Sequence, residues 1–139
     1  MRIALAESVA DLTRCYPVIA ELRPHLSEAQ FLAQVARQRE QAYELAYVEA
    51  SGAINSVAGF RLMEMLAFGK ILYIDDLITT DAQRSHGYGA QLFDWLCDQA
   101  RQQGCAQLHL DSGVQRFAAH RFYLRQRMEI NSHHFALKL

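Results

Sequence analysis

The sequence is poor in the residues and runs that mark several classes of protein. Only two prolines and seven glycines occur among 139 residues, which excludes collagen-like and proline-rich disordered chains. No apolar run approaches the roughly 20 residues that a membrane helix needs. The first residues hold no apolar stretch long enough for a signal peptide. We therefore expect a cytoplasmic protein that does not act at a membrane.

Cysteine is also scarce, and its spacing excludes two kinds of site. Cys15, Cys97 and Cys105 are far apart, and none belongs to a CxxC pair. Neither a disulfide framework nor a zinc site is indicated, and we expect three packed thiols and no metal.

Charge of one sign does not dominate the chain either. The net charge of −1 argues against a nucleic-acid partner. Residues 1–82 carry 7 basic and 11 acidic side chains, a net −4, and residues 83–139 carry 7 and 4, a net +3. An acidic first half suits a cationic ligand and a basic second half suits an anionic one.

The length predicts one domain over residues 1–139, with enough chain for one sizeable core. Apolar periodicity and turn residues predict an α/β (α+β) fold, with a mixed, mostly antiparallel sheet and helices on both faces. The expected order is β-α-α-β-β-β-α-β-α-β. The elements are a strand over 2–6, a helix after Ser8 that Pro17 kinks or breaks, a helix after Ser27, strands over 42–50, 54–65 and 70–79, a helix after Gly89, a strand over 105–111, a helix capped by 112–115 and ending near Arg127, and a strand over 129–138.

The segment 75–90 carries the clearest chemical signal. It runs from a strand through a turn with Arg84, Gly87 and Gly89 directly into a helix. Glycines let the backbone approach a ligand, and a helix N-terminus attracts anions, so this turn is typical of a phosphate site. No lysine lies here, which excludes a Walker A loop, and position 92 is Leu, which excludes a dinucleotide-binding fingerprint.

Three motifs in order resemble the GCN5-related N-acetyltransferase (GNAT) family. The pattern Arg84-x-x-Gly87-x-Gly89 resembles that family's pyrophosphate loop for coenzyme A. Residues 119–123 look like its second motif, a helix that presents a tyrosine to the coenzyme A sulfur. Residues 73–78 are similar to the fourth strand of polyamine-type members. The resemblance extends over the whole chain, although Arg116 and the pair Arg127-Met128 depart from residues common in the family.

The resemblance implies an enzyme that moves an acetyl group from acetyl-CoA to a primary amine by direct attack. The sheet should splay open after the fourth strand. Leu77 and Thr79 should bind the pantetheine arm there, and an N–H near Ile78 should stabilise the oxyanion. The residues expected to hold the pyrophosphate are Arg84, Ser85, His86, Gly87, Tyr88, Gly89 and Ala90.

The resemblance also assigns the catalytic roles. Tyr123 is expected to protonate the departing thiolate, and neighbouring arginines should lower the pKa of its hydroxyl. Asp75 is the expected general base, with His86, His109 and His120 as weaker candidates. Asp75 and Asp76 are expected on opposite faces of their strand.

The acceptor amine is less well defined. Asp75, Asp76 and Arg23 are the expected substrate-binding residues. The acidic residues favour a cationic amine, whereas Arg23 and His25 could receive a carboxylate or phosphonate. A small amine or a protein lysine would fit, and a homodimer is one assembly that the resemblance allows. A non-catalytic acyl-CoA sensor and a nucleotide-phosphate binder of another fold remain the alternatives.

Overall fold

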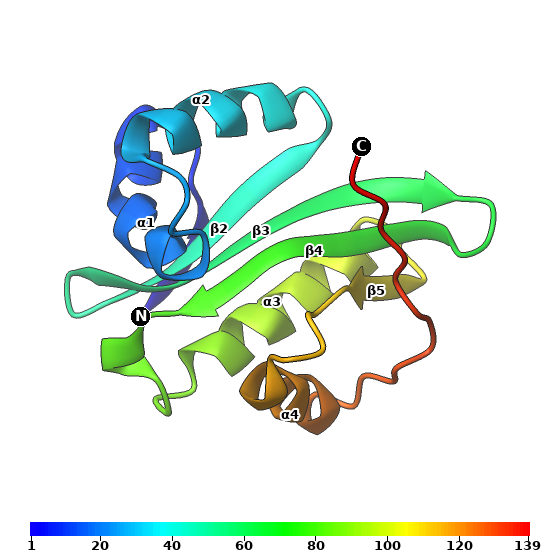
Figure 1. The fold of residues 1–139 in the computed structure, drawn as a ribbon. Helices are drawn as coiled ribbons and strands as arrows, with labels where there is room; N and C mark the ends of the chain where they lie inside the picture. The colour runs from blue at the N-terminus through cyan, green and yellow to red at the C-terminus, as the bar shows by residue number, and fades with distance from the viewer. The chain divides into compact units, whose positions relative to one another are not determined.

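The computed structural model describes residues 1–139, which form two compact units, Met1–His109 and Leu110–Leu139 (Figure 1). A five-stranded sheet with the order β1-β2-β3-β4-β5 dominates the first unit. Its strands are β1 (Arg2–Leu5), β2 (Tyr43–Ala50), β3 (Ala53–Met65), β4 (Gly69–Thr79) and β5 (Gln107–Leu110). The pairings from β1 to β4 are antiparallel, and Figure 1 shows β5 running in the same direction as β4. The predicted mixed sheet and its central meander are confirmed, and a single N-acetyltransferase domain over 1–139 stays a prediction.

Three helices belong to the first unit: α1 (Val9–Leu22), α2 (Glu28–Arg39) and α3 (Tyr88–Gln102). Capping boxes start two of them, with Ser8 paired to Asp11 at α1 and Ser27 paired to Gln30 at α2. Of the kink or break predicted at Pro17, the break does not occur, because α1 continues through that residue, and the kink stays a prediction. Pro17 is exposed, and the buried side chains on both sides of it hold the helix against the sheet.

The two faces of the sheet are covered by different helices. Along β2, Tyr43, Leu45 and Tyr47 belong to one apolar cluster with residues of α1 and α2. Ala46 and Val48 point to the opposite face, as the two-residue period of a strand requires, and are also buried. The buried residues of α3 lie outside that cluster, and α3 contacts β3 and β4. Helices on both faces of the sheet are therefore confirmed.

The second unit contains one helix, α4 (Phe117–Arg125), and ends in an extended segment. The prediction that residues 112–115 cap this helix is wrong, since Arg116 is the N-cap and a turn precedes it. The predicted strand over 129–138 is also wrong, because residues 128–139 form no strand. Alternating apolar residues favour a strand but do not supply the neighbour that a strand needs. No helix of the protein is both long and apolar enough to span a membrane.

Candidate active site

The turn between β4 and α3 leaves a helix N-terminus open. A single 3-10 turn (Asp81–Gln83) follows β4, and Gly87 then caps α3 with φ of +82°. Glycine adopts this left-handed conformation without strain. No side chain caps the helix, so the N–H groups of Tyr88, Gly89 and Ala90 donate no hydrogen bond to a capping side chain. An uncapped N-terminus of a 15-residue helix fits a phosphate group.

The side chains of the same turn are accessible. Arg84 forms an ion pair with Asp81 at 2.8 Å, and its side chain is 61% exposed. The Nδ1 atom of His86 lies 3.1 Å from the carbonyl oxygen of Gln83, and the His86 ring stacks on Tyr88. Ser85 is exposed and has φ of +71°. The structure therefore brings the predicted pyrophosphate residues together in one exposed turn.

No strand of the sheet follows β4 to its C-terminal end on the side away from β3. The chain enters β5 beside Lys70, where the N–H of Ala106 donates to the Lys70 carbonyl at 3.0 Å. The four residues of β5 extend about 13 Å and cannot follow β4 to Thr79 at its far end. The C-terminal part of β4 is therefore an edge of the sheet, and the splaying of the sheet after β4 stays a prediction.

Backbone alternation decides which residues face this open edge. The N–H of Thr80 donates to the Asn55 carbonyl at 2.9 Å, so Thr80 faces β3. The pairing from Thr79 to Leu77 is regular, and Ile78 therefore faces β3 as well. Leu77 and Thr79 direct their N–H and C=O groups to the open edge. The Ile78 N–H itself lies on the β3 side, so the N–H groups near it that face the open edge are those of Leu77 and Thr79. An oxyanion donor near Ile78 stays a prediction.

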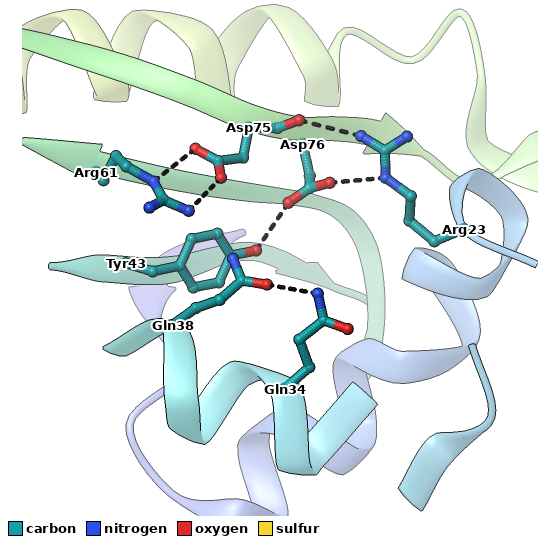
Figure 2. A network of polar contacts seen from close by, with 7 residues as sticks. All are labelled: Arg23, Gln34, Gln38, Tyr43, Arg61, Asp75 and Asp76. Atoms are coloured by element: carbon teal, nitrogen blue, oxygen red, sulfur yellow. Dashed lines mark hydrogen bonds and ion pairs between the residues drawn. The ribbon is translucent and has the colours of Figure 1, made fainter. Parts of the chain in front are cut away.

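The acidic pair lies at a β-bulge just before this edge. Gly59 pairs with Asp76 and Phe60 pairs with Ile74, which leaves Asp75 as the extra residue. Both carboxylates lie on the Tyr43 side of β4 (Figure 2). The prediction that Asp75 and Asp76 point to opposite faces is wrong, because the bulge interrupts the alternation on which it depended.

Two arginines pair with these aspartates (Figure 2). Arg61 donates from Nε to Oδ1 of Asp75 at 3.1 Å and from Nη2 to Oδ2 at 2.5 Å. Arg23 donates from Nε to Oδ1 of Asp76 at 2.9 Å and from Nη2 to the Asp75 carbonyl at 3.1 Å. The predicted substrate residues Arg23, Asp75 and Asp76 thus form one connected network.

Tyr43 completes this network from β2. Its hydroxyl donates to Oδ2 of Asp76 at 2.9 Å, and the Arg61 guanidinium lies 5.6 Å from its ring centroid. Burial raises the pKa of Tyr43 well above its usual value, and the nearby Asp76 carboxylate raises it further. The Tyr43 hydroxyl therefore stays protonated and keeps donating.

Gly59 provides the space for this contact. A Cβ atom at Gly59 would lie 1.9 Å from the Tyr43 hydroxyl oxygen and 2.6 Å from Oδ2 of Asp76. Only a residue without a side chain is compatible with the Tyr43–Asp76 hydrogen bond. No sequence motif predicted a role in the site for Tyr43, Gly59 or Arg61. A glycine inside a strand often marks a place where another group comes close to the backbone, and Gly59 was the one such signal in the sequence.

A cavity of about 210 Å³ adjoins the network. Apolar side chains of α1 and α2, including Ile19, Phe31 and Val35, form part of its lining. The polar part comes from Arg23, His25, Gln34, Gln38, Tyr43 and Asp76. Small-molecule sites are concave and combine apolar walls with placed polar groups, and this cavity has both, with the larger number of its lining residues polar.

Tyr123 lies on α4 in the second unit. It is half-buried, its ring contacts Phe122 with centroids 5.6 Å apart, and Arg116 is the arginine that acts on its hydroxyl. Burial raises the pKa of Tyr123 above 10, and the opposing effect of Arg116 is smaller. The expected lowering of this pKa is therefore wrong, because desolvation outweighs the one arginine in contact. A protonated hydroxyl is the form that can act as an acid.

The remaining candidate side chains have local partners. His109 contacts Gln107 and packs on Phe68, and His120 lies 2.8 Å from the Gly113 carbonyl oxygen. Burial raises the pKa of Cys15 to about 12 and also raises that of Cys97, so neither thiol is activated. No three His, Cys, Asp or Glu side chains gather as a metal site would require.

Comparison with known proteins gives matches over most of the chain. The Acetyltransferase (GNAT) family model matches residues 6–127. The N-acetyltransferase YhdJ of Bacillus subtilis, itself uncharacterised, is 38% identical over 117 residues, which cover 84% of this chain and 82% of that protein. An aminoalkylphosphonate N-acetyltransferase of Salmonella typhimurium is 33% identical over 78 residues, 56% of this chain and 49% of that protein.

A solved structure shows the same fold. The ribosomal-protein-alanine N-acetyltransferase of Brucella melitensis superposes with a TM-score of 0.83 at 16% identity, with all of both chains covered. At that identity the match concerns the fold alone. The family model and the Bacillus relative, by contrast, cover the loop, the open strand edge and the network described above. On these grounds the chain belongs to the GNAT family of acetyltransferases and is an N-acetyltransferase.

Proposed function

We propose that the protein transfers an acetyl group from acetyl-CoA to a small primary amine by direct attack. The observation that carries this proposal is the uncapped N-terminus of α3, which directly follows the open edge of β4. Members of the family use acetyl-CoA, whose thioester supplies the activated acetyl group. An anion site next to free backbone donors suits a long ligand that has a pyrophosphate and an amide-containing arm.

Different segments of the chain would bind different parts of acetyl-CoA. The turn at 84–90 would hold the pyrophosphate through backbone N–H groups, with Arg84 as a further donor. Leu77 and Thr79 would pair with the pantetheine arm from the edge of β4. One of their N–H groups would donate to the thioester oxygen as negative charge develops on it. These donors are fixed by the sheet and need no rearrangement when the reaction occurs.

The chemical step requires two proton transfers. The amine forms the new C–N bond and gives up a proton, for which Asp75 is the proposed acceptor, held in place by Arg61. The C–S bond breaks, and the thiolate takes a proton from the proposed acid Tyr123. Because burial raises the pKa of Tyr123, this hydroxyl carries its proton throughout the neutral range. No covalent enzyme intermediate is needed.

A thermal-shift titration combined with a thiol-release assay tests the proposal. Acetyl-CoA should raise the Tm in proportion to the logarithm of its concentration once binding saturates, and ADP should do so less effectively. Small primary amines should then release free thiol from acetyl-CoA. An equal Tm shift with ADP would favour a nucleotide-phosphate binder. Stabilisation by acetyl-CoA without thiol release from any primary amine would favour an acyl-CoA sensor.

A further inference from the structure

The two carboxylates of the network already have cationic or hydroxyl partners on every oxygen. Both oxygens of Asp75 accept from Arg61, and those of Asp76 accept from Arg23 and Tyr43. A second ammonium group on a substrate would have to compete with these donors. The acidic pair is therefore poorly suited to recognise a cationic substrate.

The arginine is the more accessible partner at the cavity. The side chain of Arg23 is 41% exposed, whereas that of Asp76 is 15% exposed. A guanidinium has five N–H groups, and the contacts to Asp76 and Asp75 use two of them. The other N–H groups of Arg23 remain for a ligand that enters the cavity.

A pair of amides adds donors from α2. The Nε2 atom of Gln34 donates to Oε1 of Gln38 at 3.0 Å, and both side chains line the cavity (Figure 2). In this hydrogen bond one glutamine uses its NH₂ group and the other uses its oxygen, so the NH₂ group of the second glutamine is not used within the pair. The same holds if both amides are flipped. Arg23 and this amide group together offer N–H donors to the same space, and Asp76, which also lines it, offsets the charge of Arg23.

We infer that this cavity receives the anionic tail of the acceptor amine, a carboxylate or phosphonate group. The inference rests on the proposed function, since it assigns the substrate class of the same site. A volume of about 210 Å³ has room for a small oxyacid group at the end of the acceptor amine. The planar guanidinium of Arg23 matches two oxygens of such a group.

Four amines of matched length test the inference without any variant. The acceptors are propylamine with a neutral tail, β-alanine with a carboxylate, 2-aminoethylphosphonate with a phosphonate, and 1,3-diaminopropane with a cation. The kcat/KM of at least one anionic amine should exceed that of propylamine by roughly tenfold or more, because charge-assisted bonds are the stronger kind. The ratio of β-alanine to 2-aminoethylphosphonate identifies which oxyacid the cavity prefers.

The variant Arg23→Gln separates recognition from structure. It should lower kcat/KM for the preferred anionic amine by roughly 10- to 100-fold, mainly through KM, and change that for propylamine less than threefold. Diaminopropane should improve relative to propylamine, because Asp76 loses its cationic partner. Arg37→Gln, on an exposed residue of α2 outside the cavity, makes the same charge change and should leave all four ratios unchanged.

The outcomes of these assays separate the anionic-tail inference from the proposed function. Turnover of the amines with no preference for an anionic tail overturns the inference and leaves the proposed function intact. An equal loss for all four amines in Arg23→Gln also overturns it, because Arg23 would then be structural. Turnover of none of the four by a protein that acetyl-CoA stabilises overturns both. If Arg23→Gln does not fold, Arg23→Lys should show a smaller loss confined to the anionic amines.

Discussion

Substitution of Gly59 by alanine should destabilise the protein through one specific clash. The added Cβ would lie 1.9 Å from the hydroxyl oxygen and 2.5 Å from Cζ of Tyr43, whose side chain is only 3% exposed and cannot swing into solvent. Overpacking of a buried site costs roughly 1–3 kcal/mol, and loss of a hydrogen bond to a charged group costs roughly 1.5–3 kcal/mol. We expect Gly59→Ala to lower the free energy of unfolding by about 3 kcal/mol.

A double-mutant cycle with Tyr43→Phe identifies the cause. Tyr43→Phe removes the hydroxyl and with it the donor to Asp76, and should cost about 2 kcal/mol by itself. In that background the hydrogen bond and the shortest contact of the new Cβ are both absent, so Gly59→Ala should cost about 2 kcal/mol less than it does in the native chain. Urea unfolding monitored by circular dichroism measures all four free energies.

Tyr16→Phe provides a matched control. It removes a hydroxyl that donates to the Leu26 carbonyl at 2.7 Å and that has no contact with the network. Its effect should add to that of Gly59→Ala within about 0.5 kcal/mol. Additivity of Gly59→Ala with Tyr43→Phe to the same precision would refute the reasoning, as would a cost of Gly59→Ala below about 0.5 kcal/mol.

Three further predictions concern the loop, the acid and a thiol. Gly87→Val forces a β-branched residue to φ of +82° and should abolish the Tm increase with acetyl-CoA, although the protein still unfolds cooperatively. An unchanged Tm increase would contradict the assignment of this loop to the pyrophosphate. Tyr123→Phe should lower kcat by about 10²–10³ with little change in coenzyme A binding, and native turnover in the variant would leave Tyr123 as packing only. Because burial raises the pKa of Tyr123, native kcat should show no loss from its ionisation through the neutral range. Burial raises the pKa of the Cys15 thiol to about 12, so its contribution to stability should be complete below pH 9 and should decrease from pH 9 toward 12. Urea unfolding at several pH values should show this decrease in the native chain and not in Cys15→Ala.

Much of the fold could be predicted because local patterns and tertiary structure agree in the first unit. Alternating residues over β2, β3 and β4 and the turns at Ser51-Gly52 and Phe68-Gly69 give the meander nearly to its observed bounds. Capping residues place the starts of α1 and α2. Each of these signals is local, since it lies within the segment that it describes.

The errors arise where the outcome depends on a distant neighbour. The residue pattern around Asp75 is regular, and the bulge follows only from the pairing with β3, so the common orientation of the two carboxylates could not be foreseen. The pKa of Tyr123 depends on what buries the ring more than on the arginines nearby in sequence. The segment over 129–138 has a strand pattern but forms no strand. The sequence predicts the site residues that belong to a motif, whereas Tyr43 and Arg61 acquire their roles only through cross-strand contacts.

The bulge at Asp75 has a consequence for insertions and deletions in this gene. Gly59 pairs with Asp76 and Phe60 with Ile74, so removal of codon 75 alone would join these pairs into an uninterrupted ladder. Every other side chain of β4 would keep its partner and its face, whereas removal of a codon within the regular part of the strand would reverse the orientation of the residues on one side of it. Asp75 is thus the one residue of β4 that the sheet does not require.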